Sequence, residues 1–250
     1  MLHNGSNVVV HLRPADVVAR VATLTAAVRP GIEAWFERDA LVARHLVARG
    51  VPATRPIVPA LAVDGFVVGL WSYEPHDPDH VVSPAEVAGR LFDLHVALAD
   101  LSCDLPVLGP CDDLERMFAH VRVPEPVLAV FRAENARLRS ALSAFPTQPL
   151  HGDAHPGNLL ATPTGLMWND FEDTWRGPLG WDLACLTASS RADGAEAVAA
   201  YPGSVPDEEL ATCIELRELY ATVWRFVIAS HFPARRPEAE SHLERWLAAR

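Results

Sequence analysis

The spacing of hydrophobic positions near the start of the chain predicts a β-hairpin followed by a helix. Residues 7–12 and 16–23 are runs of β-branched side chains on either side of a proline-containing turn, which is typical of a hairpin. Residues 31–49 carry apolar side chains at the helical period of about 3.6 residues. Gly50 and Pro52 directly after this run predict where the helix ends.

Two more strands and then a mainly helical region follow. Residues 57–63 and 65–73 predict strands joined at Asp64-Gly65, a dipeptide typical of tight hairpins. The acidic, proline-containing segment 74–80 marks the change to helical periodicity. Beyond it, the pattern predicts helices over residues 84–100, 111–121, 124–144, 180–190, 193–201, 207–231 and 238–249, with short strands over 159–162 and 166–170.

These elements predict an α+β fold in two parts. Residues 1–74 are expected to form a small, sheet-rich N-terminal lobe, and residues 75–250 a larger helical lobe, with a hinge near residues 71–80. A chain of 250 residues can bury a substantial core. Because ligands commonly bind in the cleft between two such parts, the functional site is expected there.

Charge and composition argue against several classes of function. The net charge of −11 argues against a nucleic-acid partner, which calls for a basic face. It is compatible with a cationic acceptor, but the charge of the whole chain does not fix the charge of one cleft. No apolar run approaches the roughly 20 residues that span a bilayer, and the first residues do not resemble a signal peptide, so a cytoplasmic location without membrane contact is expected. The four cysteines form no CxxC pair and are expected to be free thiols.

Residues 150–182 (LHGDAHPGNLLATPTGLMWNDFEDTWRGPLGWD) carry most of the functional information. Asp153, Asn158 and Asp170 lie at short intervals here, and the glycines and proline around the first two predict a loop rather than a helix. Asp153 in such a loop is placed to act as a general base on a substrate hydroxyl. The amide oxygen of Asn158 and the carboxylate of Asp170 suit Mg²⁺. These groups together are typical of phosphoryl transfer.

A metal-hydrolase site is the competing interpretation of the same stretch. His151, Asp153 and His155 form an HxDxH pattern, and histidines four residues apart bind zinc when they share a helix face. Gly152 and Pro156 disrupt a helix here, and no second histidine-rich segment is nearby. Phosphoryl transfer is therefore the preferred interpretation.

The motifs HGDAHPGN at 151–158, DFED at 170–173 and WDLA at 181–184 resemble those of the aminoglycoside phosphotransferases and choline kinases. The spacing of five between Asp153 and Asn158 equals that in the HRDxxxxN loop of protein kinases. The resemblance implies a protein-kinase-like bilobal fold. It also implies Asp153 as catalytic base, Asn158 and Asp170 as Mg²⁺ ligands, and Asp182 as a brace of the catalytic loop. It is specific over residues 150–182 and extends to the rest of the chain through the order of the lobes.

The absence of lysine changes the predicted nucleotide site. Kinases hold the α- and β-phosphates with a strand lysine that pairs with a helix glutamate, but all 21 basic residues here are arginine. Arg20 lies in the corresponding strand. Asp39 interrupts the apolar face of helix 31–49, where an unpaired carboxylate is unfavourable, whereas Glu37 points to the opposite face. The hypothesis is that Arg20 and Asp39 form an ion pair that orients the phosphates of ATP; the alternative is a purely structural salt bridge.

Four other nucleotide contacts are expected from their position alone. Gly5 and Ser6 precede the first strand, where their backbone amides are candidates for covering phosphates. Trp71 and Tyr73 fall where the hinge of this family holds the purine through backbone groups; the alternative for each side chain is an ordinary strand end.

Further residues of the motif stretch have either a structural or an acceptor-side role. His151 is predicted to be a packed or hydrogen-bonded loop residue, and His155 either shapes the loop or faces the acceptor. Glu172 and Asp173 either face the substrate and metal-bound water or form a solvated acidic turn.

The sequence as a whole predicts an enzyme that transfers the γ-phosphoryl group of ATP to a hydroxyl of a small molecule, with Mg²⁺ as cofactor. The absent lysine and the short N-terminal loop favour the alternative of a nucleotide-binding regulatory pseudokinase without turnover. The sequence distinguishes neither the acceptor nor ATP from GTP, nor does it give the oligomeric state. Acidic residues 207–218 either line a pocket for a cationic acceptor or form a solvated helix face.

Overall fold

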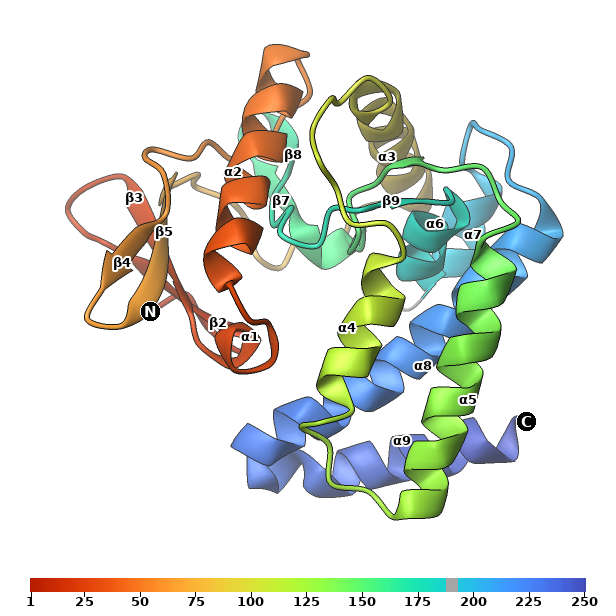
Figure 1. Cartoon of the computed structure of the whole chain (residues 1–250). Helices are drawn as coiled ribbons and strands as arrows, with labels where there is room; N and C mark the ends of the chain where they lie inside the picture. Colours follow the sequence, from red (N-terminus) through yellow and green to blue (C-terminus); the bar gives the residue numbers. More distant parts are fainter. Residues whose placement is uncertain (188–192) are drawn as a thin grey trace.

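The computed structural model describes residues 1–187 and 193–250. A small antiparallel sheet and helix α2 (Ile32–Ala48) lie on one side of the molecule, and a larger group of helices lies on the other (Figure 1). The N-terminus lies beside the sheet and the C-terminus among the helices (Figure 1). This is the α+β architecture in two parts that the sequence predicts.

Two antiparallel hairpins pair with each other to make the N-terminal sheet. Strand β1 (His3–Asn4) pairs with β2 (Asn7–His11), and β2 pairs with β3 (Val17–Ala22) from Asn7 opposite Ala22 to His11 opposite Val18. Strand β4 (Leu61–Val63) pairs with β5 (Phe66–Ser72). Because β3 also pairs with β5, the strand order is β1-β2-β3-β5-β4. Both predicted hairpins are confirmed.

Two parts of this lobe differ from the sequence prediction. The strand expected over residues 57–63 begins only at Leu61, because the chain bends at Val58 and Pro59 and proline has no N–H to donate. Helix α1 (Leu24–Val28) follows β3 directly and is not indicated by the sequence pattern. Its five residues are too few to display a helical period.

Helix α2 has the amphipathic character that its sequence predicts. Trp35 and Phe36 pack with Val67 of the sheet in a small core of the N-terminal lobe. Asp39 is 0% exposed on the buried face, whereas Glu37 is exposed to solvent. Burial of the apolar face therefore carries one carboxylate into the interior, where it needs a partner.

The long helix α8 (Asp207–His231) is the centre of the helical region. It packs against α5 (Glu125–Leu142), α6 (Gly180–Thr187) and α9 (Arg236–Ala248) (Figure 1). Buried α8 residues, including Leu216, Val223 and Phe226, share one large hydrophobic core with residues of those helices. Other helices here are α3 (Pro84–Leu98), α4 (Gly109–Met117) and α7 (Gly194–Ala199).

The predicted helices of this region are confirmed, with ends that differ by a few residues, as is common at fraying helix ends. Helix α3 begins with a capping box, in which Ser83 and Glu86 bond each other's backbone N–H groups. Helix α4 begins at Gly109 and ends at Met117, so the predicted range 111–121 lay too far along the chain. The end predicted at residue 190 falls outside the described residues.

Two strand pairs bring the motif segments together. Strand β7 (Leu159–Thr162) forms a hairpin with β8 (Gly165–Trp168), as predicted. Strand β6 (Gln148–Pro149), just before the 151–158 loop, pairs with β9 (Arg176–Gly177), just after the 170–173 segment. These pairings hold both segments at the centre of the molecule, facing the N-terminal lobe.

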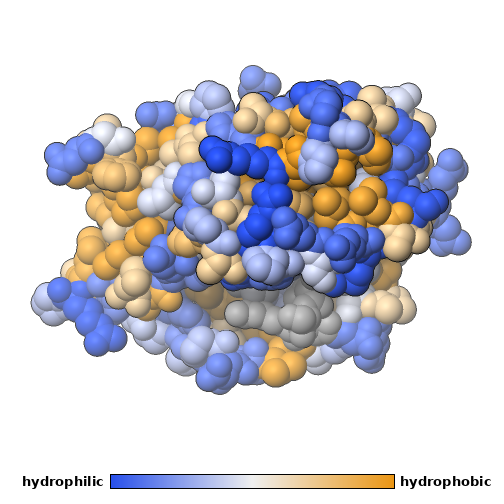
Figure 2. Space-filling model, turned by 90° about the horizontal axis from the view of Figure 1, so that it is seen from below, coloured by the Kyte–Doolittle hydropathy of each residue, from blue (hydrophilic) through white to orange (hydrophobic). Residues whose placement is uncertain are grey.

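No helix within the described ranges is long and apolar enough to cross a membrane. The face seen from below in Figure 2 mixes hydrophobic and hydrophilic residues, and its hydrophobic patches are interrupted by hydrophilic side chains.

Candidate active site

A cavity of about 810 Å³ lies where the two lobes meet. It is lined by residues of the sheet, of both motif segments and of α8. The lining includes Arg20, Asp39, Trp71, Tyr73, Asp153, Asn158, Asp170, Glu172, Arg217 and Arg225. Asp153, Asn158 and Asp170 thus face one shared cavity, although 16 residues lie between the first and the last.

The loop that carries Asp153 is braced from α6. Both carboxylate oxygens of the fully buried Asp182 accept hydrogen bonds from the loop backbone, one from His151 N–H at 2.8 Å and one from Gly152 N–H at 2.9 Å. Gly152 has a φ of +91°, and a Cβ there would lie 1.9 Å from the carbonyl oxygen of Asp173. Only glycine therefore fits where the two motif segments touch.

The side chain of Asp153 is held by an arginine and a histidine. Arg217 Nη2 of α8 lies 2.7 Å from its Oδ1, and His155 Nε2 lies 3.4 Å from its Oδ2. Burial on its own raises the pKa of Asp153, but Arg217 and His155 outweigh it and hold that pKa well below its usual range. Asp153 is therefore ionised at neutral pH and well oriented.

Asn158 and Asp170 have the donors suited to a hard divalent ion. Asn158 Nδ2 donates to the carbonyl oxygen of Asp153 at 2.8 Å, and within the described residues its Oδ1 accepts no hydrogen bond. Asp170 has a φ of +66°, which is unusual for a residue other than glycine. Such strain persists where the surrounding structure imposes it, commonly at functional sites.

Arg20 and Asp39 form a buried ion pair between β3 and α2. The same guanidinium also contacts Asp170 and lies 3.1 Å from Glu172 Oε2. Burial is the largest single influence on the pKa of Arg20 and lowers it, but the three carboxylates together raise this pKa above its usual value. Arg20 therefore stays charged. The ring of Phe36 lies 4.6 Å from the guanidinium carbon. The pair predicted from sequence is thus present, and its role toward phosphate stays a prediction.

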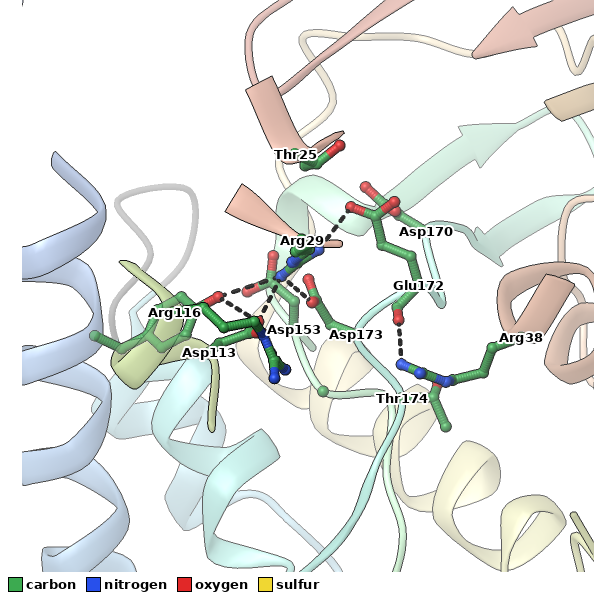
Figure 3. A network of polar contacts seen from close by, with 12 residues as sticks. Thr25, Arg29, Arg38, Asp113, Arg116, Asp153, Asp170, Glu172, Asp173 and Thr174 are labelled. Carbon is green, nitrogen blue, oxygen red and sulfur yellow. Dashed lines mark hydrogen bonds and ion pairs between the residues drawn. The ribbon is translucent and has the colours of Figure 1, made fainter. Parts of the chain in front are cut away.

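A second buried arginine, Arg29, joins three acidic side chains (Figure 3). Its Nη2 lies 2.9 Å from Asp113 Oδ2 and 2.5 Å from Asp173 Oδ1, and its Nη1 lies 3.2 Å from Glu172 Oε1. Sequence reasoning missed Arg29 because the loop between α1 and α2 gives no periodic signal. A basic residue directly before Pro30, in an otherwise apolar segment, was the available clue.

The acidic residues around these two arginines outnumber them. Burial raises the pKa of Asp39 to about 7, of Glu172 to about 8 and of Asp173 to about 6, in each case against the opposing effect of an arginine. These carboxylates line the same cavity as Asn158, and carboxylate and amide oxygens are the ligands that hard divalent cations prefer. Glu172 is only 4% exposed, so its reading as part of a solvated turn is wrong.

The metal-hydrolase interpretation is not supported by the placement of His151. Its ring is buried and its Nε2 lies 3.1 Å from the carbonyl oxygen of Asn169, so it serves the structure of the loop. Within the ranges 1–187 and 193–250, no three His, Cys, Asp or Glu side chains are grouped to hold a metal ion. Magnesium commonly needs fewer protein ligands, because phosphates and water complete its shell.

The remaining predicted contacts divide between lining and non-lining residues. Ser6, Trp71, Tyr73 and His155 line the cavity, whereas Gly5 is not among the lining residues of the described chain. The imidazole of His3 occupies the space beside Gly5, where a Cβ would lie 2.3 Å from its Nε2. Of the acidic stretch 207–218 only Arg217 lines the cavity, so that stretch does not supply an acidic pocket.

Comparison with protein-family models gives a match to the phosphotransferase enzyme family over residues 3–210. The chain belongs to this family. Comparison with curated proteins by sequence finds no match. The match includes the Asp153 loop, the Asp170 segment and Asp182, so the family resemblance of these motifs is confirmed.

Solved structures share the fold at low sequence identity. A choline/ethanolamine kinase family protein from Mesorhizobium loti has a TM-score of 0.64 at 21% identity, covering 99% of this chain and 86% of its own. Amicoumacin kinase hAmiN, solved with AMP-PNP, Ca²⁺ and Ami, has a TM-score of 0.71 at 12% identity, covering 98% and 87%. An aminoglycoside phosphotransferase from Streptomyces rimosus, solved with ADP and streptomycin, has a TM-score of 0.63 at 16% identity, covering 88% and 94%. The chain therefore has the protein-kinase-like fold of these phosphotransferases.

Proposed function

We propose that this phosphotransferase transfers the γ-phosphoryl group of ATP to a hydroxyl of a small molecule and uses Mg²⁺. The observation that carries the proposal is that Asp153, Asn158, Asp170 and the Arg20–Asp39 pair all line one cavity. We assign nucleotide binding to the N-terminal lobe, residues 1–74. We assign acceptor binding and catalysis to the helical lobe, residues 75–250. Two of the solved relatives named above, amicoumacin kinase hAmiN and the Streptomyces rimosus phosphotransferase, were solved with AMP-PNP and ADP, which supports a nucleotide donor.

Asp153 has the position and charge to orient the acceptor hydroxyl. Because Arg217 lowers the pKa of Asp153, this carboxylate is a weak base toward a free alcohol. The proton therefore moves late, when bond formation to phosphorus has made the alcohol oxygen more acidic. Orientation of the hydroxyl is then the larger contribution of Asp153.

Asn158 and Asp170 are the residues assigned to Mg²⁺. The ion, when bound, would offset negative charge on the β- and γ-phosphates. Arg20 touches Asp170, and an arginine holds phosphate with two parallel N–H donors. Arg20 is thus assigned both to fix Asp170 and to bind phosphate, the role that lysine has in kinases. Trp71 and Tyr73 are assigned to the purine, and Ser6 to the phosphates.

An ADP-release assay across a panel of alcohols tests this function, with wild-type protein compared with Asp153→Asn. We expect turnover with at least one alcohol and a loss of roughly 10²–10⁴-fold in the variant, the usual contribution of such a group. Asp100→Asn is the matched control, because this aspartate pairs with Arg49 on the surface and should leave turnover unchanged. ATP binding without turnover on any alcohol supports the regulatory pseudokinase instead.

A further inference from the structure

One face of α8 forms the wall of the cavity beyond Asp153. The residues of this face that line the cavity are Arg217, Tyr220, Ala221, Trp224, Arg225 and Ile228. Their spacing of three and four residues places them in one stripe along the helix. This wall offers aromatic and aliphatic surface with an arginine near each end.

The carboxylates at this end of the cavity already have arginine partners. Asp113 is bound by Arg29 and by Arg116, each at 2.9 Å. Glu238 lies 2.7 Å from Arg235 Nε. Asp113 and Glu238 therefore each already have an arginine partner, which reduces what these two carboxylates offer to a cationic ligand.

Arg225 differs from the other arginines of this wall. It is half-buried and donates from Nη1 to the carbonyl oxygen of Ala221, one turn earlier in α8, at 2.9 Å. Among residues 1–187 and 193–250, no carboxylate lies within ion-pair distance of it. Burial, opposed by Glu238, lowers the pKa of Arg225, and nearby arginines lower it further. An anion beside its guanidinium would relieve both effects.

We infer that the acceptor is an anionic alcohol, whose carboxylate or phosphate is bound by Arg225 and whose hydroxyl meets Asp153. This inference rests on the proposed phosphotransferase function and names its acceptor class. The body of the acceptor lies against Tyr220, Trp224 and Ile228, which suits a ring or another apolar frame. The overall charge of −11 points the other way, but charge at one wall decides binding, not the sum over the chain.

The length of the wall sets the size of the acceptor. Arg217 binds Asp153, and Arg225 lies eight residues further along α8, which corresponds to about 12 Å along the helix axis at 1.5 Å per residue. Arginine side chains bend and take up part of this distance. The anion and the reacting hydroxyl are therefore separated by a ring or a comparable chain, and small hydroxy acids are too short.

A matched set of three alcohols tests the inference by binding alone. Para-(hydroxymethyl)benzoate, para-(aminomethyl)benzyl alcohol and para-benzenedimethanol share one ring and one reacting hydroxyl, and they differ in charge. Calorimetry in the presence of AMP-PNP and Mg²⁺ should show the benzoate binding at least about 10-fold more tightly than the other two. Arg225→Gln should remove this preference, and Arg225→Glu should favour the amine.

Arg245→Gln is the matched control. This exposed arginine of α9 contributes to the field at Arg225 and is not among the cavity-lining residues of the described chain, so the preference should survive its replacement. Tighter binding of the amine by wild type overturns the inference, as does a benzoate preference that persists in Arg225→Gln. Because the readout is binding, it is independent of turnover: a charge preference without ADP release on any alcohol contradicts the proposed function and leaves the anion site in place.

Discussion

Replacement of Arg20 by methionine tests the buried ion pair on which the nucleotide site depends. Arg20→Met keeps a long apolar side chain but removes the cation that contacts Asp39, Asp170 and Glu172. Asp39 is 0% exposed, and removal of one partner of a buried ion pair typically destabilises a protein by about 3–5 kcal/mol. Since domains are stable by about 5–15 kcal/mol in total, the variant should fold but unfold at clearly lower denaturant.

The destabilisation should depend on pH. Burial raises the pKa of Asp39 to about 7 even with Arg20 present, and without Arg20 that pKa rises further. A carboxyl group whose pKa is higher in the folded state than in the unfolded state binds its proton more tightly when the protein is folded. The stability that this group contributes is therefore lost as pH rises from about 4, its pKa in the unfolded chain, through its pKa in the folded protein. Arg20→Met should therefore be less stable relative to wild type at pH 8.5 than at pH 5.5.

Urea unfolding followed by tryptophan fluorescence measures this effect, and ADP release measures the Michaelis constant for ATP. Adding Asp39→Leu to Arg20→Met should restore part of the stability, because the unpaired Asp39 carboxylate is removed and Glu172 keeps Arg29 as its partner. The double variant should not regain nucleotide binding. Arg49→Met removes an exposed ion pair with Asp100 and should change stability by less than about 1 kcal/mol. If Arg20→Met is as stable as Arg49→Met and keeps the wild-type Michaelis constant, the assigned role of the pair is wrong.

Three shorter predictions concern the catalytic loop. Gly152→Ala should destabilise the protein by about 2–5 kcal/mol in urea unfolding, because its Cβ would overlap the Asp173 carbonyl oxygen in a left-handed backbone; wild-type stability would contradict the packing described. Asp182→Asn leaves one acceptor oxygen for two loop N–H groups, so both turnover and stability should fall, the latter by about 1.5–3 kcal/mol. An unchanged turnover number and an unchanged melting curve would refute this. Arg217→Gln should raise the lowered pKa of Asp153, so that kcat/KM begins to fall at a higher pH when the solution is acidified. The stability that ionised Asp153 contributes above about pH 4 should also become smaller. If the acid side of the kcat/KM profile does not shift, Arg217 does not hold Asp153 as described.

Much of this architecture is predictable because local signals and tertiary packing agree. The helical period over residues 31–49 places Asp39 on the buried side of α2, and a buried carboxylate requires a cation, so Arg20 follows as its partner. The hairpins are predictable from their turns, and the loop around Asp153 from glycines whose backbone conformation few other residues adopt.

Other features are not local and escape sequence reasoning. Arg29 acquires its role only when the loop after α1 meets α4 and the Asp173 segment, which are distant along the chain. In the sequence, Arg217 and Arg225 do not differ from the other polar residues of a long amphipathic helix. They face the cavity because α8 packs beside the catalytic loop. For the same reason the sequence left open whether residues 207–218 line a pocket for a cationic acceptor or form a solvated face, and the packing places Arg217 of this stretch in the cavity lining.

The convergence of Asp153, Asn158 and Asp170 on one ion and one alcohol is tested most directly by crystals grown with AMP-PNP and Mn²⁺. An anomalous difference map locates Mn²⁺ without assumptions about the ligands. We predict a peak in the cavity within about 2.5 Å of both the Asn158 Oδ1 and an Asp170 carboxylate oxygen, with Asp153 facing the γ-phosphate. Nucleotide bound in the cavity with Mn²⁺ held by other residues, or with Asn158 and Asp170 turned away from it, would contradict the assignment.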